Sequence, residues 1–69
     1  MKMIPVKSSN LKAVGYDPAS KMLHVEFHSG STFAYPGVEP EQHSAMMESS
    51  SIGSHFHTHI KSKITGIPK

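Results

Sequence analysis

Cysteine and arginine are both missing from this chain of 69 residues, and each absence disfavours a class of function. Without cysteine the chain has no disulfide staples, zinc ribbons or thiol catalysis, and nothing points to an oxidising compartment. Arginine is the side chain that forks onto phosphate and guanine with two hydrogen bonds, so its absence argues against sequence-specific reading of nucleic acid. We therefore expect a cytoplasmic protein that does not read base sequence through arginine.

Long apolar runs are lacking too. No segment approaches the length of a membrane span, and residues 1–6 are too short and interrupted for a signal peptide. At this length a domain buries only about 60% of the surface that its unfolded chain exposes, so one modest core is expected and a deep catalytic cleft is not. The sequence thus predicts one soluble domain over residues 1–69, with a core at about 6–64, that is not an enzyme and carries no cofactor.

The charge that is present is weakly basic. The formal net charge is +2, all seven cations are lysine, and six histidines are an unusual share of so short a chain. Their unperturbed pKa of about 6.5 would make the protein more cationic in mild acid. We expect stronger binding of anions at about pH 6 than at about pH 8.

Three segments have the pattern of β-strands: residues 11–16, 22–28 and 31–35. The first two are separated by 17–20, where Pro18 suits the second position of a turn, and the last two by the tight turn Ser29-Gly30. In the middle strand the side chains alternate, with Leu23, Val25 and Phe27 on one face and His24, Glu26 and His28 on the other.

Two helices should follow. Glu39-Pro40-Glu41 places proline and acids in a first helical turn, and the serines at 49–51 should end that helix. The second helix is indicated by four apolar residues spaced four apart, with Ser51 or Ser54 available as N-cap. Those four residues are Ile52, Phe56, Ile60 and Ile64. Residues 65–69 have no period and should form a loose tail.

The predicted fold class is therefore α+β, a three-stranded antiparallel β-meander followed by two short α-helices (β-β-β-α-α) packed mainly on one face. The expected core is Leu11, Val14, Leu23, Val25, Phe27, Phe33, Met46, Phe56 and Ile60.

Four blocks in this order resemble a known family of short domains. They are Ser8-Ser9-Asn10-Leu11 leading to Gly15-Tyr16-Asp17; Leu23 to Phe27 followed by Ser29-Gly30; Tyr35 to Val38; and Ser51, Gly53, Phe56, Ile60 and Lys61. Together they cover about positions 4–64 and are similar to the KTSC domain, named for its similarity to the C-terminal end of a lysyl-tRNA synthetase. Members also occur as free-standing small bacterial and phage proteins, and the family brings no established biochemical activity.

The resemblance hints at RNA through its name, which is an association and not a mechanism. This chain departs from the family pattern at three positions: His57 stands where asparagine is common, Lys61 where arginine is common, and Ile64 where an aromatic is common. If the family holds phosphate through that arginine and stacks on that aromatic, this member should bind more weakly.

The densest chemical feature is His55-Phe56-His57-Thr58-His59. On a helix it puts His55 and His59 on one face, as helical metal ligands require. Two histidines do not close a site, the glutamate of an HExxH motif is absent, and His24, Glu26 and His43 have no fixed proximity. We read the pair as partly exposed helical histidines and keep a metal site as the least favoured alternative. No G-x-S-x-G elbow frames a serine, so Ser8, Ser9, Ser51 and Ser54 read as turn and cap residues.

For nucleic acid, His55, His57, His59, Lys61, Lys63 and Lys69 form a cationic stripe that can follow a phosphate backbone. Tyr16, Phe33 and Tyr35 lie on the predicted sheet, where exposed aromatics can stack on unpaired bases. The alternative is that a small core needs those aromatics.

A protein–protein adaptor or a self-associating protein is the second hypothesis. It rests on open sheet edges and on Met46 and Met47 as adaptable apolar surface. We favour a non-catalytic binding module whose partner is RNA or a nucleic-acid-associated protein over this adaptor. Binding of the first kind should be salt-sensitive and depend on Lys61 and Lys63, and binding of the second kind should be salt-tolerant and depend on Met46 or Met47.

Overall fold

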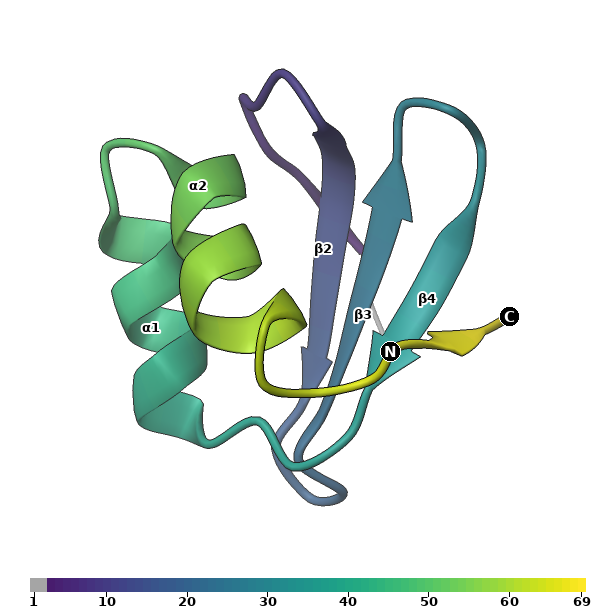
Figure 1. Ribbon diagram of the computed structural model, residues 1–69. Helices are drawn as coiled ribbons and strands as arrows, with labels where there is room; N and C mark the ends of the chain where they lie inside the picture. The colour runs from purple at the N-terminus through teal and green to yellow at the C-terminus, as the bar shows by residue number, and fades with distance from the viewer. Residues whose placement is uncertain (1–2) are drawn as a thin grey trace.

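The computed structural model describes residues 3–69, which form one antiparallel sheet with two helices on one side of it (Figure 1). The sheet has five strands in the order β1-β2-β3-β4-β5, so each strand lies beside its neighbour in sequence. The strands are β1 (Ile4–Pro5), β2 (Leu11–Asp17), β3 (Met22–Phe27), β4 (Thr32–Tyr35) and β5 (Ile67–Pro68). The helices are α1 (Pro40–Glu48) and α2 (Ile52–Phe56), which continues into the π-helical turn η1 (His57–Lys61).

The predicted α+β class and the three long strands are confirmed, but the strand count was wrong, since four strands precede the helices and a fifth follows them. The two missed strands, β1 and β5, have two residues each and contain Pro5 and Pro68. A pair of residues is too short to show alternation, and proline is tolerated in a sheet only at such edges.

The C-terminal residues are likewise more ordered than the loose tail that was predicted. Ile67 pairs with Ala34 and Pro68 with Phe33, and the amide of Lys69 donates to the carbonyl of Thr32 at 3.0 Å. These pairings cover the outer edge of β4.

Both predicted turns are present. The Asp17 carboxylate accepts a hydrogen bond from the Ala19 amide at 3.1 Å, as turn-forming aspartates do. Between β3 and β4, Gly30 has φ of 98°, a conformation that L side chains disfavour, and its amide donates to the Phe27 carbonyl at 2.9 Å. Glycine therefore fits this turn because of its backbone.

Strand pairing sorts the side chains into two faces. Val14 lies opposite Val25, which lies opposite Phe33, and these residues point toward the helices. Across the strands Gly15 pairs with His24 and His24 with Ala34 on the other face. A bulge between Leu11 and Ala13 interrupts the register at one end of β2. The predicted alternation of β3 is thus confirmed.

The first helix starts as the sequence predicted. Pro40 occupies its first turn, and the Glu39 amide donates to the Gln42 side chain at 2.8 Å. The helix ends at Glu48, before the serines.

The second helix differs in two ways from the prediction. Its second half is π-helical, and Ser51 holds the N-cap position without a capping hydrogen bond from its hydroxyl. That backbone is held instead by Ser49, whose hydroxyl accepts from the Ser51 amide at 3.2 Å.

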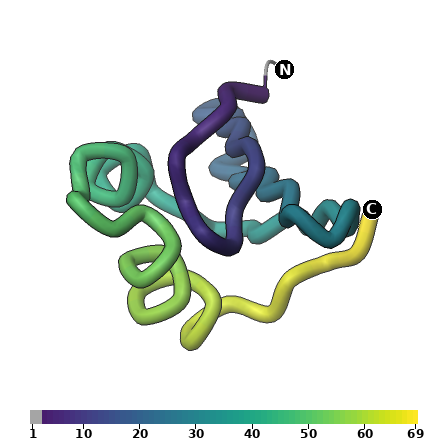
Figure 2. Tube along the Cα trace, turned by 90° about the horizontal axis from the view of Figure 1, so that it is seen from above, coloured from purple at the N-terminus to yellow at the C-terminus, as the bar shows by residue number. Residues whose placement is uncertain are grey.

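The core lies between the sheet and the helices, which sit over the β2 side and leave β4 farther from them (Figures 1 and 2). Seven of the nine predicted core residues are buried, whereas Phe27 and Phe33 are only partly buried. Tyr35 and Val38 are buried as well. None of the described helices is long and apolar enough to cross a membrane.

Candidate ligand-binding groove

Three adjoining clefts of about 450, 440 and 420 Å³ follow one flank of the helix formed by α2 and η1. The first two share Ser9, Asn10, Gly53 and His57, and the second and third share Phe27 and Lys61. Because their linings overlap, we treat them as one groove with a hydroxyl cleft, a middle cleft and an aromatic cleft.

The hydroxyl cleft lies between the loop before β2 and the start of α2. It is lined by Lys7, Ser8, Ser9, Asn10, Ser50, Ser51, Ile52, Gly53, Ser54, His57 and Thr58. Hydroxyl and amide groups therefore dominate its wall.

The loop of the hydroxyl cleft is held in place from three sides. The Ser8 hydroxyl accepts from the amides of Asn10 and Leu11, each at 3.3 Å, so Ser8 is a turn residue as predicted. The His28 Nε2 lies 2.9 Å from the Ser8 carbonyl, to which it donates as the N–H tautomer. A Cβ on Gly53 would stand 2.7 Å from the Ser8 hydroxyl oxygen, so only glycine lets the helix approach the loop this closely.

The aromatic cleft is lined by Phe27, Phe33, Tyr35, Lys61, Ser62, Lys63, Ile64, Thr65 and Gly66. Its rings belong to an edge-to-face series that runs out of the core. Ring centroids are 5.0 Å apart for Tyr35 and Phe56, 6.0 Å for Phe56 and Phe27, and 5.9 Å for Phe27 and Phe33. Buried Tyr35 and Phe56 thus support the partly exposed rings of Phe27 and Phe33.

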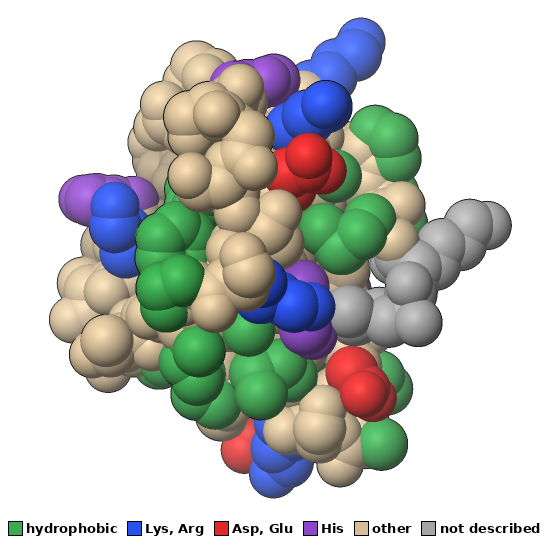
Figure 3. Space-filling model, turned by 90° about the vertical axis from the view of Figure 1, so that its right-hand side faces the viewer, with side chains coloured by type: hydrophobic (Ala, Val, Ile, Leu, Met, Phe, Trp, Pro, Cys, Tyr) green, Lys and Arg blue, Asp and Glu red, His purple; other side chains and the backbone are tan. Residues whose placement is uncertain are grey.

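Charge is distributed unevenly around the molecule. Among residues 3–69, every ionisable side chain that lines the three clefts, apart from the Tyr35 phenol, is a lysine or a histidine: Lys7, His28, His57, Lys61 and Lys63. Two ion pairs within residues 3–69 lie outside these clefts: Lys12 with Glu26 at 4.0 Å, and Lys21 with Glu39 at 3.0 Å. The sheet-edge face in Figure 3 carries both signs of charge. Within residues 3–69 the lining of the groove thus supplies basic groups and no acidic ones.

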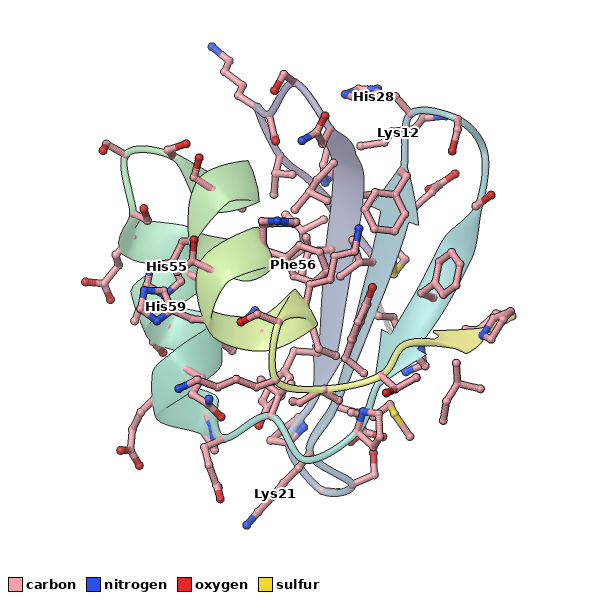
Figure 4. All side chains as sticks on the ribbon, viewed as in Figure 1. Lys12, Lys21, His28, His55, Phe56 and His59 are labelled. Atoms are coloured by element: carbon pink, nitrogen blue, oxygen red, sulfur yellow. The ribbon has the colours of Figure 1, made fainter. Side chains whose placement is uncertain are left out.

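Four of the predicted nucleic-acid contacts line this groove, namely His57, Lys61, Lys63 and Tyr35. His55 and His59 do not. Their rings lie side by side on the flank of the helix near α1 (Figure 4), with centroids 4.3 Å apart. They line a separate cleft of about 270 Å³ with Glu41, Gln42, Ala45 and Lys63.

The two tyrosines predicted as stacking surfaces are covered to different extents. Tyr35 is only 3% exposed, and burial raises the pKa of its phenol. Tyr16 is half-buried, stacks on His43 with ring centroids 4.6 Å apart, and donates to the Val38 carbonyl at 2.5 Å. Burial, followed by the nearby Glu39 charge, raises the pKa of Tyr16. Both tyrosines point toward the helices, which cover that part of the sheet.

The metal hypothesis gains no third ligand. No group of three or more histidines, aspartates or glutamates within the described residues is placed to hold a metal ion. His55 and His59 thus remain a pair.

The adaptor hypothesis loses one of the two features on which it rested. Met46 is fully buried, and Met47 packs partly against the core. Adjacent helical positions point about 100° apart, so Met46 lies in the core and Met47 lies at its edge.

The sequence prediction missed Phe27, Lys7, Ser9 and Asn10 as groove residues. Phe27 and Phe33 were placed in the core because they alternate with polar residues in the predicted strands. Their partial exposure follows from the position of the helices over β2, which strand periodicity does not encode.

Comparisons with known proteins agree with one another. The model of the KTSC domain family matches residues 7–63. An uncharacterised protein from Stutzerimonas stutzeri is 43% identical over 61 residues, 88% of this chain and 86% of that protein. A protein from Tsukamurella paurometabola is 34% identical over 65 residues, 94% of this chain and 97% of that protein. The crystal structure of a KTSC domain protein from Yersinia pestis superposes with a TM-score of 0.91 at 35% identity, covering 99% of this chain and 96% of that one.

Proposed function

The chain belongs to the KTSC domain family, as the resemblance in its sequence indicated, and we propose that this member is a non-catalytic module that binds nucleic acid in the groove beside α2 and η1. The observation that carries the proposal is the charge of the groove. Its lining supplies Lys7, Lys61 and Lys63 and no acidic side chain within residues 3–69. A polyanion is the ligand that such a surface attracts.

Besides positive charge, the groove offers aromatic rings on which unpaired bases can stack. Lys61 and Phe27 both line the middle cleft and the aromatic cleft. A phosphate at the ammonium group of Lys61 would leave the neighbouring base near the phenylalanine rings. Stacking on aromatic side chains tolerates every base, which suits a chain without arginine.

An NMR titration of isotope-labelled protein with a short mixed single-stranded RNA, at low and moderate salt, tests the proposal. We expect amide shifts confined to residues that line the groove and weakened by salt. With two or three lysines on phosphates, the logarithm of affinity should fall with the logarithm of salt with a slope of about −1.5 to −2.

Lys61→Gln should weaken binding about 3- to 10-fold, whereas the matched control Lys12→Gln should not, since Lys12 pairs with Glu26 outside the groove. The absence of shifts in the groove, or equal effects of the two variants, would refute the proposal.

A second candidate is association with a protein or with another copy of this chain. It is favoured by Ile4 and Ile67 on the short edge strands, which are 51% and 50% exposed. Such association should tolerate salt and be lost in Ile67→Thr. Analytical ultracentrifugation of the two forms at two salt concentrations distinguishes it from nucleic-acid binding.

A further inference from the structure

The two ends of the groove differ in chemistry, and this difference specifies which nucleic acid it fits. Resting on the proposed function, we propose that the ligand is an unpaired RNA strand. Its bases meet Phe27 and Phe33 in the aromatic cleft, and its ribose 2′-hydroxyls meet the hydroxyl cleft, so that RNA is preferred to DNA of the same sequence.

The aromatic cleft requires an unpaired base. Phe27 and Phe33 are partly buried in a concave surface and are fixed by edge-to-face contacts with the rings beneath them. Only the face of a base can stack on such a ring, and in a duplex both faces are covered by neighbouring base pairs. A single strand can turn a base into the cleft.

The hydroxyl cleft is suited to sugar hydroxyls more than to phosphates. Lys7 and His57 are its ionisable groups among residues 3–69, and the remainder of its polar wall is neutral. Five of its six hydroxyl side chains make no hydrogen bond to other described residues: Ser9, Ser50, Ser51, Ser54 and Thr58. A free hydroxyl both donates and accepts, which matches a 2′-hydroxyl group that does the same.

The distance between the two ends suits a short strand. The helix from Ile52 to Lys61 is about 15 Å long at about 1.5 Å per residue, and the groove follows its flank. A few nucleotides span this length. Lys61 lies between the ends, where it can hold the connecting phosphate while the sugar and the base are recognised on either side.

Fluorescence anisotropy with matched oligonucleotides tests the inference. The probes are one mixed-sequence single-stranded RNA, the DNA of the same sequence, the 2′-O-methyl RNA and a blunt RNA duplex. We expect the single-stranded RNA to bind roughly 30-fold more tightly than the DNA, as two hydrogen bonds would provide, and the duplex to bind most weakly.

The variant Ser54→Ala/Thr58→Val removes two free hydroxyls at exposed helical positions and should fold, because alanine is the best helix former and valine keeps the shape of threonine. It should bring RNA affinity down to that of DNA and leave DNA affinity unchanged. Ser44→Ala, an exposed serine on α1, is the matched control and should change neither. Phe33→Leu should weaken RNA and DNA about equally.

The outcomes separate the two proposals. Equal binding of RNA and DNA, a duplex bound as tightly as the single strand, or a Ser54/Thr58 variant that retains the RNA preference overturns this inference and leaves nucleic-acid binding in place. Failure of all four probes to bind overturns the proposed function itself.

Discussion

Because Gly53 lies close to Ser8, the substitution Gly53→Ala should destabilise the wild-type protein but stabilise a variant that lacks the Ser8 hydroxyl. Gly53→Ala should stabilise a helix by about 1 kcal/mol on helix propensity alone. Here, however, the new Cβ would stand 2.7 Å from the Ser8 hydroxyl oxygen, too close to remain there. The hydroxyl must rotate away and lose its bonds with the amides of Asn10 and Leu11.

The magnitude follows from these two opposing terms. Two hydrogen bonds at about 1 kcal/mol each outweigh the helix term, so Gly53→Ala should destabilise the wild-type protein by about 1 kcal/mol. In a Ser8→Ala background the oxygen is absent, and the remaining Ser8 Cβ stands at 4.0 Å, an ordinary contact. There Gly53→Ala should stabilise by about 1 kcal/mol, which makes the coupling between the two sites about 2 kcal/mol.

Urea unfolding of the four proteins in the double-mutant cycle measures this coupling, and thermal midpoints provide a second measure at roughly 4–8 °C per kcal/mol for a domain of this size. If Gly53→Ala has the same effect in both backgrounds, the hydroxyl does not restrict the helix and the reasoning fails.

Three further predictions follow from other contacts. A Cβ on Gly66 would lie 2.8–2.9 Å from three atoms of the buried Tyr35 ring, so Gly66→Ala should lower the free energy of unfolding by about 1–3 kcal/mol in urea, and an unchanged value would contradict this packing. Burial lowers the pKa of His43 below its ordinary 6.5, so the unfolded chain binds the proton more readily; stability should be retained above pH 6.5 and fall as the pH drops below it. In His43→Phe the loss of stability below pH 6.5 should be smaller. It should not vanish, because burial and Lys69 lower the pKa of His24 as well. A variant with the same pH profile as the wild type would refute the role of His43. Zinc added at a one-to-one ratio should produce no saturable shift of the His55 and His59 ring signals, because the described residues supply no third ligand, and a stoichiometric shift would restore the metal hypothesis.

Local sequence patterns were sufficient to predict the central part of the fold. Leu23, Val25 and Phe27 alternate with polar residues and form a strand, and Pro40 opens a helix, because each signal depends on residues a few positions apart. The edge strands were missed because Ile4–Pro5 and Ile67–Pro68 are too short for any period, and their pairing depends on tertiary contact. The π-helical turn at His57–Lys61 escaped prediction because the spacing from Phe56 to Ile60 fits an ordinary helix.

The candidate site was predicted in part for the same reason. The cationic stripe predicted along the helix included His57, Lys61 and Lys63, which line the groove, and also His55 and His59, which do not. Of the aromatics predicted to stack on bases, Phe33 is partly exposed and Tyr35 is buried, because exposure depends on which strands the helices cover. Tyr35 and Phe33 belong to the same strand and are only two residues apart, yet Tyr35 is buried against Phe56 and Phe33 is only partly buried.

The order of the strands has a consequence for how the chain folds. From β1 to β4 each strand pairs with its immediate successor, so these contacts close short loops and should form quickly. The pairing of β4 with β5 is the exception, since both helices lie between the two strands in the chain. Closing that long loop can be favourable only after the helices have packed, so β5 should join the sheet last. Until then the outer edge of β4 is unpaired, so the folding chain should expose a strand edge that the finished domain covers.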